Sequence, residues 1–169
     1  MAYVTQATSK SDSGKRTWNI KLIDLGNNQS ETVLQGESPL LLLGWNDVGG
    51  DLLVATLKGT NDFSIRATVV SLVSISTTGA SRNIAELTAT YIHNTLLAPD
   101  RRTIAFVSHQ DGKDNISLIS AKGGAPRKIT FNNDPRLFFS NMAFSPDGKA
   151  IYFGKQSRST VISMIDNFK

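Results

Sequence analysis

The chain has 169 residues, a formal net charge of +4 at pH 7 and no cysteine. A chain of this length can bury roughly two thirds of the surface that its unfolded form exposes, which is enough for one domain. The absence of cysteine excludes disulfides, thiolate metal ligands and a cysteine nucleophile. No apolar run approaches the ~18 residues of a membrane-spanning helix, and residues 1–6 do not resemble a secretory signal, so we expect no membrane insertion.

The apolar pattern predicts short β-strands in four successive units that together form a single segment, residues 1–169. The first unit, 2–36, is partial and holds strands at 2–6, 18–25 and 31–34. The second unit, 40–87, holds strands at 40–45, 52–57, within 65–76 and at 83–87. The third, 91–130, holds strands at 91–97, 103–108, 115–120 and 127–130, and the fourth, 137–168, is partial, with strands at 141–144, 150–154 and 160–165. The first unit lacks its innermost strand and the last lacks its outermost.

A ten-residue segment occurs twice, 47 residues apart, as LAPDRRTIAF at 97–106 and FSPDGKAIYF at 144–153. A Pro-Asp pair before an apolar strand is typical of a tight turn, since Pro fixes φ and Asp bonds the backbone two residues on. Gly148 stands at the turn position best suited to a positive φ, where the first copy has Arg101 and a degenerate third copy, 45–54, has Gly49. A fixed period of this length is typical of repeat architectures, in which each unit stacks on its neighbours.

The second copy, together with residues 104–112, 116–119 and the pair at 123–124, resembles the WD-like β-propeller repeat of the TolB type. The resemblance is strong over 97–165 and weak over 45–87. It implies an all-β, propeller-like fold of about four blades, each a four-stranded antiparallel sheet, with incomplete terminal blades. It also implies a propeller fragment that is the C-terminal part of a larger bacterial protein. Propellers of this type act mostly as binding or sensing modules.

Catalytic candidates are few. His93 and His109 are the only histidines, and no carboxylate or second histidine stands at ligand spacing beside either. No Gly-x-Ser-x-Gly elbow is present, and the glycine pairs precede strands rather than the helix of a phosphate-binding loop. We therefore expect that the chain is not an enzyme and holds no metal and no cofactor.

Turn chemistry explains the acidic positions that look like sites. Residues 111–115, DGKDN, fail the twelve-residue calcium pattern and predict a hairpin turn. Asp100 and Asp147 look like a carboxylate pair, but they occupy equivalent positions in the two repeats. Their recurrence is therefore expected from the turn alone.

The positive net charge raises the question of nucleic-acid binding. The basic residues are dispersed, chiefly as Lys10, Lys15, Arg16, Arg101, Arg102, Arg127, Lys128 and Arg158. A phosphate-binding surface needs cations that converge on one face, and aromatic stacking partners strengthen it. We expect no nucleic-acid binding by this segment.

Two functions remain. The first is a non-catalytic binding or sensory module, TolB-like or the C-terminal sensor of a regulator, that takes a protein partner or a small ligand as part of a larger protein. The innermost strands, 91–97 and 141–144, would then line the channel and present His93, Asn94 and Asn141 to the ligand. The alternative is the substrate-gating propeller of a prolyl-oligopeptidase-type serine peptidase, which the appearance of residues 167–169 as a natural C-terminus disfavours.

Incomplete terminal units predict open sheet edges, which are templates for pairing with another chain, so we expect an open arc that self-associates. A cysteine-free chain tolerates an oxidising compartment, and we expect a periplasmic or extracytoplasmic location rather than a cytoplasmic one. Between the blades we expect the following residues to be buried: Ile104, Phe106, Ile116, Leu118, Phe144, Ile151, Phe153 and Ile162.

Overall fold

A computed structural model describes residues 1–8, 16–47, 50–58 and 69–157. These residues form an all-β structure in which every pair of neighbouring strands is antiparallel. The first sheet has the order β1–β2–β3, with β1 at Ala2–Thr8, β2 at Arg16–Ile23 and β3 at Ser30–Gly36. The second has the order β4–β5–β6–β7, at Leu40–Trp45, Leu52–Lys58, Val69–Ile75 and Ser81–Thr88.

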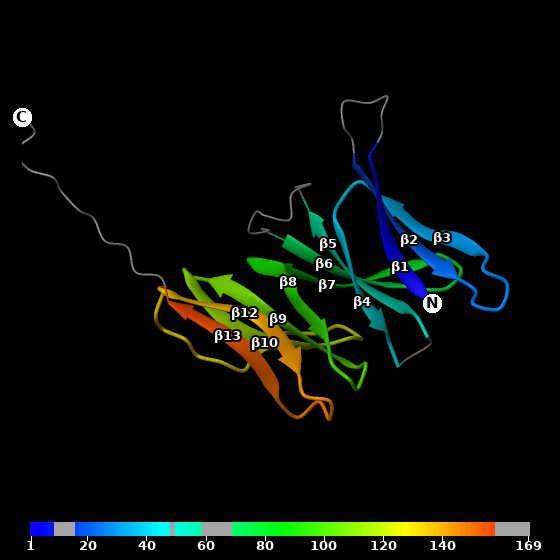
Figure 1. The fold of residues 1–169 in the computed structure, drawn as a ribbon. Helices are drawn as coiled ribbons and strands as arrows, with labels where there is room; N and C mark the ends of the chain where they lie inside the picture. The colour runs from blue at the N-terminus through cyan, green and yellow to red at the C-terminus, as the bar shows by residue number, and fades with distance from the viewer. Residues whose placement is uncertain (9–15, 48–49, 59–68, 158–169) are drawn as a thin grey trace, which may run out of the picture.

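The third sheet has the order β8–β9–β10–β11, at Thr90–Leu97, Thr103–Gln110, Lys113–Ser120 and Arg127–Lys128. The fourth pairs β12, Leu137–Phe144, with β13, Ile151–Ser157. The four sheets lie side by side, with β1–β3 at one end and β12–β13 at the other (Figure 1). Strand β8 contacts β4 on one side and β12 on the other, so the first strands of these three sheets share an inner edge.

The strands form in meander order because each apolar run is separated from the next by turn residues. The sequence of β5 is a nearly continuous apolar run because both faces of the strand are packed. Its residues Leu52 and Val54 pack toward the first sheet, whereas Leu53, Ala55 and Leu57 pack toward the third. A strand covered on both faces has no solvent face for polar residues, so the polar alternation of a half-exposed strand is lost.

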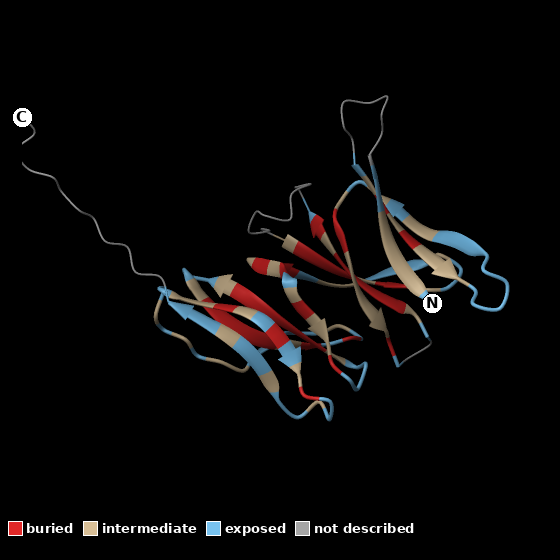
Figure 2. Ribbon diagram, viewed as in Figure 1, coloured by how far each residue is buried: buried red, intermediate tan, exposed pale blue. Residues whose placement is uncertain are grey.

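Apolar side chains fill the spaces between successive sheets, and the buried residues concentrate on the two middle sheets (Figure 2). The space between the first and second sheets holds Trp18, Ile20 and Ile75. The space between the second and third holds Leu72, Ile104 and Phe106, and that between the third and fourth holds Val107, Ile116 and Phe139. The core is therefore a series of layers, one for each contact between sheets.

Most of the expected core residues lie in these layers. Ile104, Phe106 and Ile116 are buried, whereas Leu118, Phe144 and Ile151 are half-buried but pack against the same clusters. The prediction for Phe153 is wrong, because its side chain is 38% exposed. Phe153 lies on β13, an outer strand of the described fourth sheet, and its ring lies 4.8 Å from that of Phe139, measured between centroids. Ile162 and the strand expected at 160–165 lie outside the described residues.

The repeated segment forms the same turn in both copies. The N–H of Ala98 donates to Thr103 O at 2.8 Å, and the N–H of Ser145 donates to Ala150 O at 2.9 Å. Arg101 and Gly148 have left-handed φ angles of 57° and 70°, as their equivalent positions require. The expectation for Gly49 lies outside the described residues, although the N–H of Asn46 closes a corresponding turn on Asp51 O at 2.8 Å.

Candidate functional site

The inner strands β8 and β12 carry the three residues predicted to contact a ligand. His93 on β8 and Asn141 on β12 are exposed, and Asn94 on β8 is half-buried. Asn94 and Asn141 are 47 residues apart, which is the repeat period, so they occupy equivalent places on neighbouring strands. These three positions stay predictions, and the surroundings of each determine what it can do.

Both asparagines lie at interruptions of the strand ladder. The pairing of β8 with β9 shifts between Thr90 and Thr95, and the pairing of β12 with β13 shifts between Ser140 and Ala143. Asn141 has a left-handed φ of 52° at its interruption. Bulges of this kind redirect side chains and free backbone groups from the ladder, and they are common next to binding sites.

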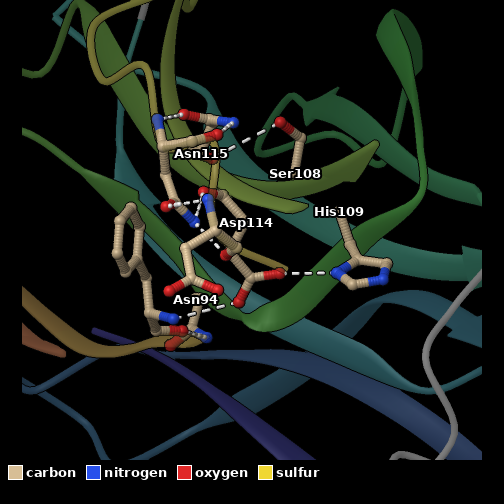
Figure 3. Close-up of polar contacts among 8 residues, drawn as sticks. Asn94, Ser108, His109, Asp114 and Asn115 are labelled. Atoms are coloured by element: carbon tan, nitrogen blue, oxygen red, sulfur yellow. Dashed lines mark hydrogen bonds and ion pairs between the residues drawn. The ribbon is translucent and has the colours of Figure 1, made fainter. Parts of the chain in front are cut away.

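The side chain of Asn94 and that of Asp114 on β10 both reach the backbone of Phe139 on β12 (Figure 3). Asn94 Nδ2 donates to Phe139 O at 3.2 Å, and Phe139 N–H donates to Asp114 Oδ2 at 2.9 Å. Two side chains of the third sheet thus bind both polar backbone groups of one residue in the fourth. This contact fixes β12 against β8 at the inner edge.

His109 has a carboxylate partner, so the expectation of none at ligand spacing is wrong. Its Nδ1 lies 2.6 Å from Asp114 Oδ1, and the Asp114 side chain is 1% exposed (Figure 3). The two residues pair directly across the β9–β10 hairpin, whose turn at Asp111 and Gly112 has positive φ at both positions. The hairpin predicted at 111–115 is therefore confirmed. Its register places His109 opposite Asp114, so the hairpin signal could have predicted their contact.

A second polar group holds the connection between the third and fourth sheets. Asn115 Oδ1 accepts hydrogen bonds from the N–H of Asn132 at 2.7 Å and from Thr130 Oγ1 at 3.2 Å. Asn132 Nδ2 in turn donates to the carbonyl oxygens of Asp114 at 3.2 Å and Asp134 at 3.1 Å. Side chains therefore supply the bonds that this irregular connection does not obtain from a strand ladder.

The repeated aspartates, Asp100 and Asp147, accept hydrogen bonds within their own turns. Asp100 Oδ1 accepts from the N–H groups of Arg102 at 2.8 Å and Thr103 at 3.0 Å, whereas Asp147 Oδ1 accepts from Ser145 Oγ at 2.6 Å. Partial burial on its own raises the pKa of Asp100, but the hydrogen bonds from Arg102 and Thr103 together hold it below the ordinary value. The pKa of Asp147 is lowered mainly by the Ser145 hydroxyl. The turn interpretation of this pair is confirmed.

The two end sheets differ in the character of their outer faces. On the fourth sheet, Ala143 pairs with Tyr152 on the face opposite to the Phe139 cluster, and Tyr152 is 65% exposed. The equivalent residues of the third sheet, 47 positions earlier, are Leu96 and Ala105, and both pack in the cluster between the third and fourth sheets. The outer face of the fourth sheet therefore exposes apolar groups. The equivalent positions of the third sheet are covered by the fourth sheet.

The outer face of the first sheet is polar by comparison. Val4 and Ile20 pack toward the second sheet. On the other face, Thr5 pairs with Asn19 and Tyr3 pairs with Lys21. These paired residues make the outer face of the first sheet more polar than that of the fourth.

The groups described above interact through hydrogen bonds and charge. Within the described ranges, no three His, Asp or Glu side chains gather in a group that could hold a metal ion. The described part of the chain also contains no helix with the length and apolarity to span a membrane. The His109–Asp114 pair is joined to the backbone of the next sheet, which gives it a structural role in this arrangement.

Four-stranded antiparallel sheets that stack on one another and share an inner edge are the blades of a β-propeller. The structure is similar to TolB from Acinetobacter baumannii, with a TM-score of 0.60, 17% identity, and coverage of 89% of this chain and 35% of that one. It is also similar to a protein assigned as TolB from Agrobacterium tumefaciens, with a TM-score of 0.54, 19% identity, and coverage of 81% and 45%. The fold is therefore that of part of a TolB-type propeller.

The aligned part of the chain covers 35% and 45% of the lengths of these two TolB structures, less than half of each. No family model matches the sequence. No curated protein matches it either. The expected fold class, all-β with antiparallel blades, is confirmed by the sheets and by the likeness to TolB.

Proposed function

We propose that the chain is the binding part of a propeller, a non-catalytic module that takes a protein partner at the inner edge formed by β8 and β12. The observation that carries the proposal is the presence of exposed His93 and Asn141 on these two neighbouring strands. Asn94 and Asp114 fix the strands relative to each other through Phe139. Contact residues on strands held in this way are preorganised for a ligand.

Capture of a partner from the source cells tests this function. We would immobilise the chain and compare it with the double variant His93→Ala/Asn141→Ala and with Asn83→Ala, an exposed residue of the outer strand β7. We expect the double variant to lose the protein that wild type and Asn83→Ala retain. Equal capture by all three would place the contact elsewhere, and hydrolysis of peptides by the chain would contradict a non-catalytic module.

The proposal includes the extracytoplasmic location, which a cysteine-free chain tolerates. We take its ligand to be a protein rather than a small molecule because the two exposed contact residues lie on separate strands. No observation on the described residues favours the peptidase-gating alternative, which stays a hypothesis.

The sequence predicted self-association through open blade edges; we propose instead that two copies associate through the outer faces of β12 and β13. This face carries the exposed Tyr152 and Ala143, whose equivalents are covered by a sheet one repeat earlier. A head-to-tail contact would bury Asn19 and Lys21 of the polar first sheet without their water, which is costly. A two-fold contact of the apolar face with itself avoids that cost and closes as a dimer.

Sedimentation velocity tests the dimer. We expect the wild-type chain to associate as its concentration rises, and Tyr152→Lys to remain monomeric. Thr5→Lys, on the outer face of the first sheet, is the matched control and should associate like wild type. Monomeric wild-type chain, or association abolished by Thr5→Lys instead, would contradict this contact.

A further inference from the structure

A pocket of about 260 Å³ lies between the second and third sheets, at the end that carries the repeated turns. Four cationic side chains line it, Arg82, Arg101, Arg102 and Lys122, beside Asn46 and Ser120. The sequence separates these cations by up to 40 positions, which follows from residue numbers 82 and 122. The expectation that the basic residues are dispersed is therefore wrong for this group, because packing of the two sheets brings them together.

Backbone contacts hold the segments around the pocket. Gly123 lies so close to β7 that a Cβ there would be 2.9 Å from Ile84 O, which places Lys122 next to the strand of Arg82. The N–H of Ala121 donates to Arg102 O at 2.7 Å. The turn after β10 is thus fixed to both the second sheet and the repeated turn, so the positions of the cations are set by the fold.

The charges in the pocket are unbalanced. Arg102 Nε donates to Asp47 Oδ2 at 2.7 Å. In the part of the chain that the structure describes, no carboxylate forms an ion pair with Arg82, Arg101 or Lys122. Three cations around one pocket, without an ion-pair partner among the described residues, raise the local concentration of anions.

The backbone conformation of Arg101 determines where its side chain lies. Its φ of 57° is left-handed, a conformation that is unfavourable for a residue with a side chain. The equivalent position of the next repeat has Gly148, which adopts the same conformation without that cost. The same turn conformation therefore places the guanidinium of Arg101 at the pocket, where the next repeat carries no side chain.

We infer that this pocket binds the carboxylates of an acidic peptide segment. The inference rests on the proposed function only in taking the segment to belong to the protein partner, and it adds a contact distinct from the inner edge. Arginine guanidinium groups bind carboxylates through paired N–H donors. Arg102 already holds the carboxylate of Asp47 in this way, which shows the chemistry that a ligand would extend to Arg82, Arg101 and Lys122.

The arrangement favours an extended chain over one compact ion. All four cationic residues are exposed at the mouth of the pocket, and they come from three separate segments of the protein. Because the cations lie on separate segments, we take the ligand to be an extended chain whose successive glutamates each meet one of them. Interactions of this kind weaken as the salt concentration rises.

Fluorescence anisotropy with labelled hexaglutamate tests the site, with labelled hexaglutamine as the uncharged control peptide. We expect hexaglutamate alone to bind, and the variant Arg82→Gln/Arg101→Gly to bind it about tenfold more weakly. Arg127→Gln, an exposed cation of β11 outside the pocket, is the matched control and should bind like wild type. Equal weakening by Arg127→Gln would show attraction to net charge only and would overturn the inference.

Two further measurements keep the result interpretable. Inorganic phosphate should not compete with hexaglutamate at equal ionic strength, and competition by phosphate would assign the pocket to a compact anion instead. His93→Ala/Asn141→Ala should retain hexaglutamate binding, because the inner edge is a separate surface. If hexaglutamate fails to bind while the inner-edge variant still loses the captured partner, this inference fails and the proposed function stands.

Discussion

Asp114 in the third sheet accepts a hydrogen bond from the backbone N–H of Phe139 in the fourth, at 2.9 Å. The other oxygen of the same carboxylate lies 2.6 Å from His109 Nδ1. A carboxylate that is 1% exposed needs such partners to offset the loss of water. The two sheets are therefore joined by a directional bond as well as by apolar packing, and the bond determines how β12 lies at the inner edge.

Removal of the Asp114 carboxylate should destabilise the protein strongly. We expect Asp114→Ala to lower the free energy of unfolding by about 3–5 kcal/mol, because it leaves buried polar partners unsatisfied. Asp114→Asn retains one acceptor oxygen and should cost less. The matched control is Glu86→Ala, which removes an exposed ion pair with Lys58 and should cost under about 1 kcal/mol. Urea unfolding of the three variants measures these values, and equal costs for Asp114→Ala and Glu86→Ala would contradict the role of Asp114.

Gly123 and Gly124 provide a matched pair for the contact between the turn after β10 and β7. Both have positive φ, 99° and 110°, so alanine is strained at either position. Only at Gly123 does the added Cβ meet a backbone atom, Ile84 O at 2.9 Å. We expect Gly124→Ala to cost about 1–2 kcal/mol and Gly123→Ala about 2–4 kcal/mol, since the clash adds to the strain. Thermal unfolding compares them, and an equal loss would show that the turn moves away freely.

Arg101→Gly should stabilise the protein while it weakens hexaglutamate binding. The substitution removes the strain of a left-handed arginine, and the greater freedom of glycine in the unfolded chain offsets part of this, leaving a gain of about 0.5–1 kcal/mol. The reverse change, Gly148→Ala, should destabilise by about 1–2 kcal/mol although its Cβ has room, 3.7 Å from Pro99 Cδ. Chemical unfolding measures the free energy of unfolding of both variants. A destabilised Arg101→Gly would mean that the arginine side chain supports the fold.

The carboxyl group of Asp134 should have an unusually low pKa. The guanidinium of Arg136 and its backbone N–H lower the pKa of Asp134 to about 2, from an ordinary 3.8. Because the folded pKa is depressed, the stabilising effect is present above pH ~4 and is lost as the pH falls toward 2. Carboxyl NMR should show the low midpoint, and Arg136→Ala should move it back up. A midpoint near 3.8 in the wild-type protein would contradict the ion pair.

The sequence predicted the strands well because turn residues within each unit mark where its strands begin and end. Asp111-Gly112 and the doubled Pro-Asp segment mark hairpins locally, and the strands between them follow from apolar runs. The equivalence of Arg101 and Gly148 was also readable, since a repeat aligns positions of the same backbone conformation. Local signals of this kind need no knowledge of how the sheets stack.

Contacts between sheets were not predictable in this way. Nothing in the sequence links Asp114 to Phe139, or Lys122 to Arg82, because both pairs meet only when neighbouring sheets stack. The exposure of Phe153 was not predictable either, because its side chain lies on β13, an outer strand of the sheet, and is 38% exposed although it is on the face that carries Phe139. The pairing of His109 with Asp114 lies between these cases, because it follows once the hairpin register is known.

The central claim is that the inner edge of β8 and β12 receives a protein partner. Amide NMR spectra of the labelled chain, recorded with and without the captured partner, test it directly. We expect the largest changes in chemical shift at His93, Asn94 and Asn141, with little change on the outer strands β3 and β7. Changes confined to those outer strands, with the inner edge unaffected, would contradict it.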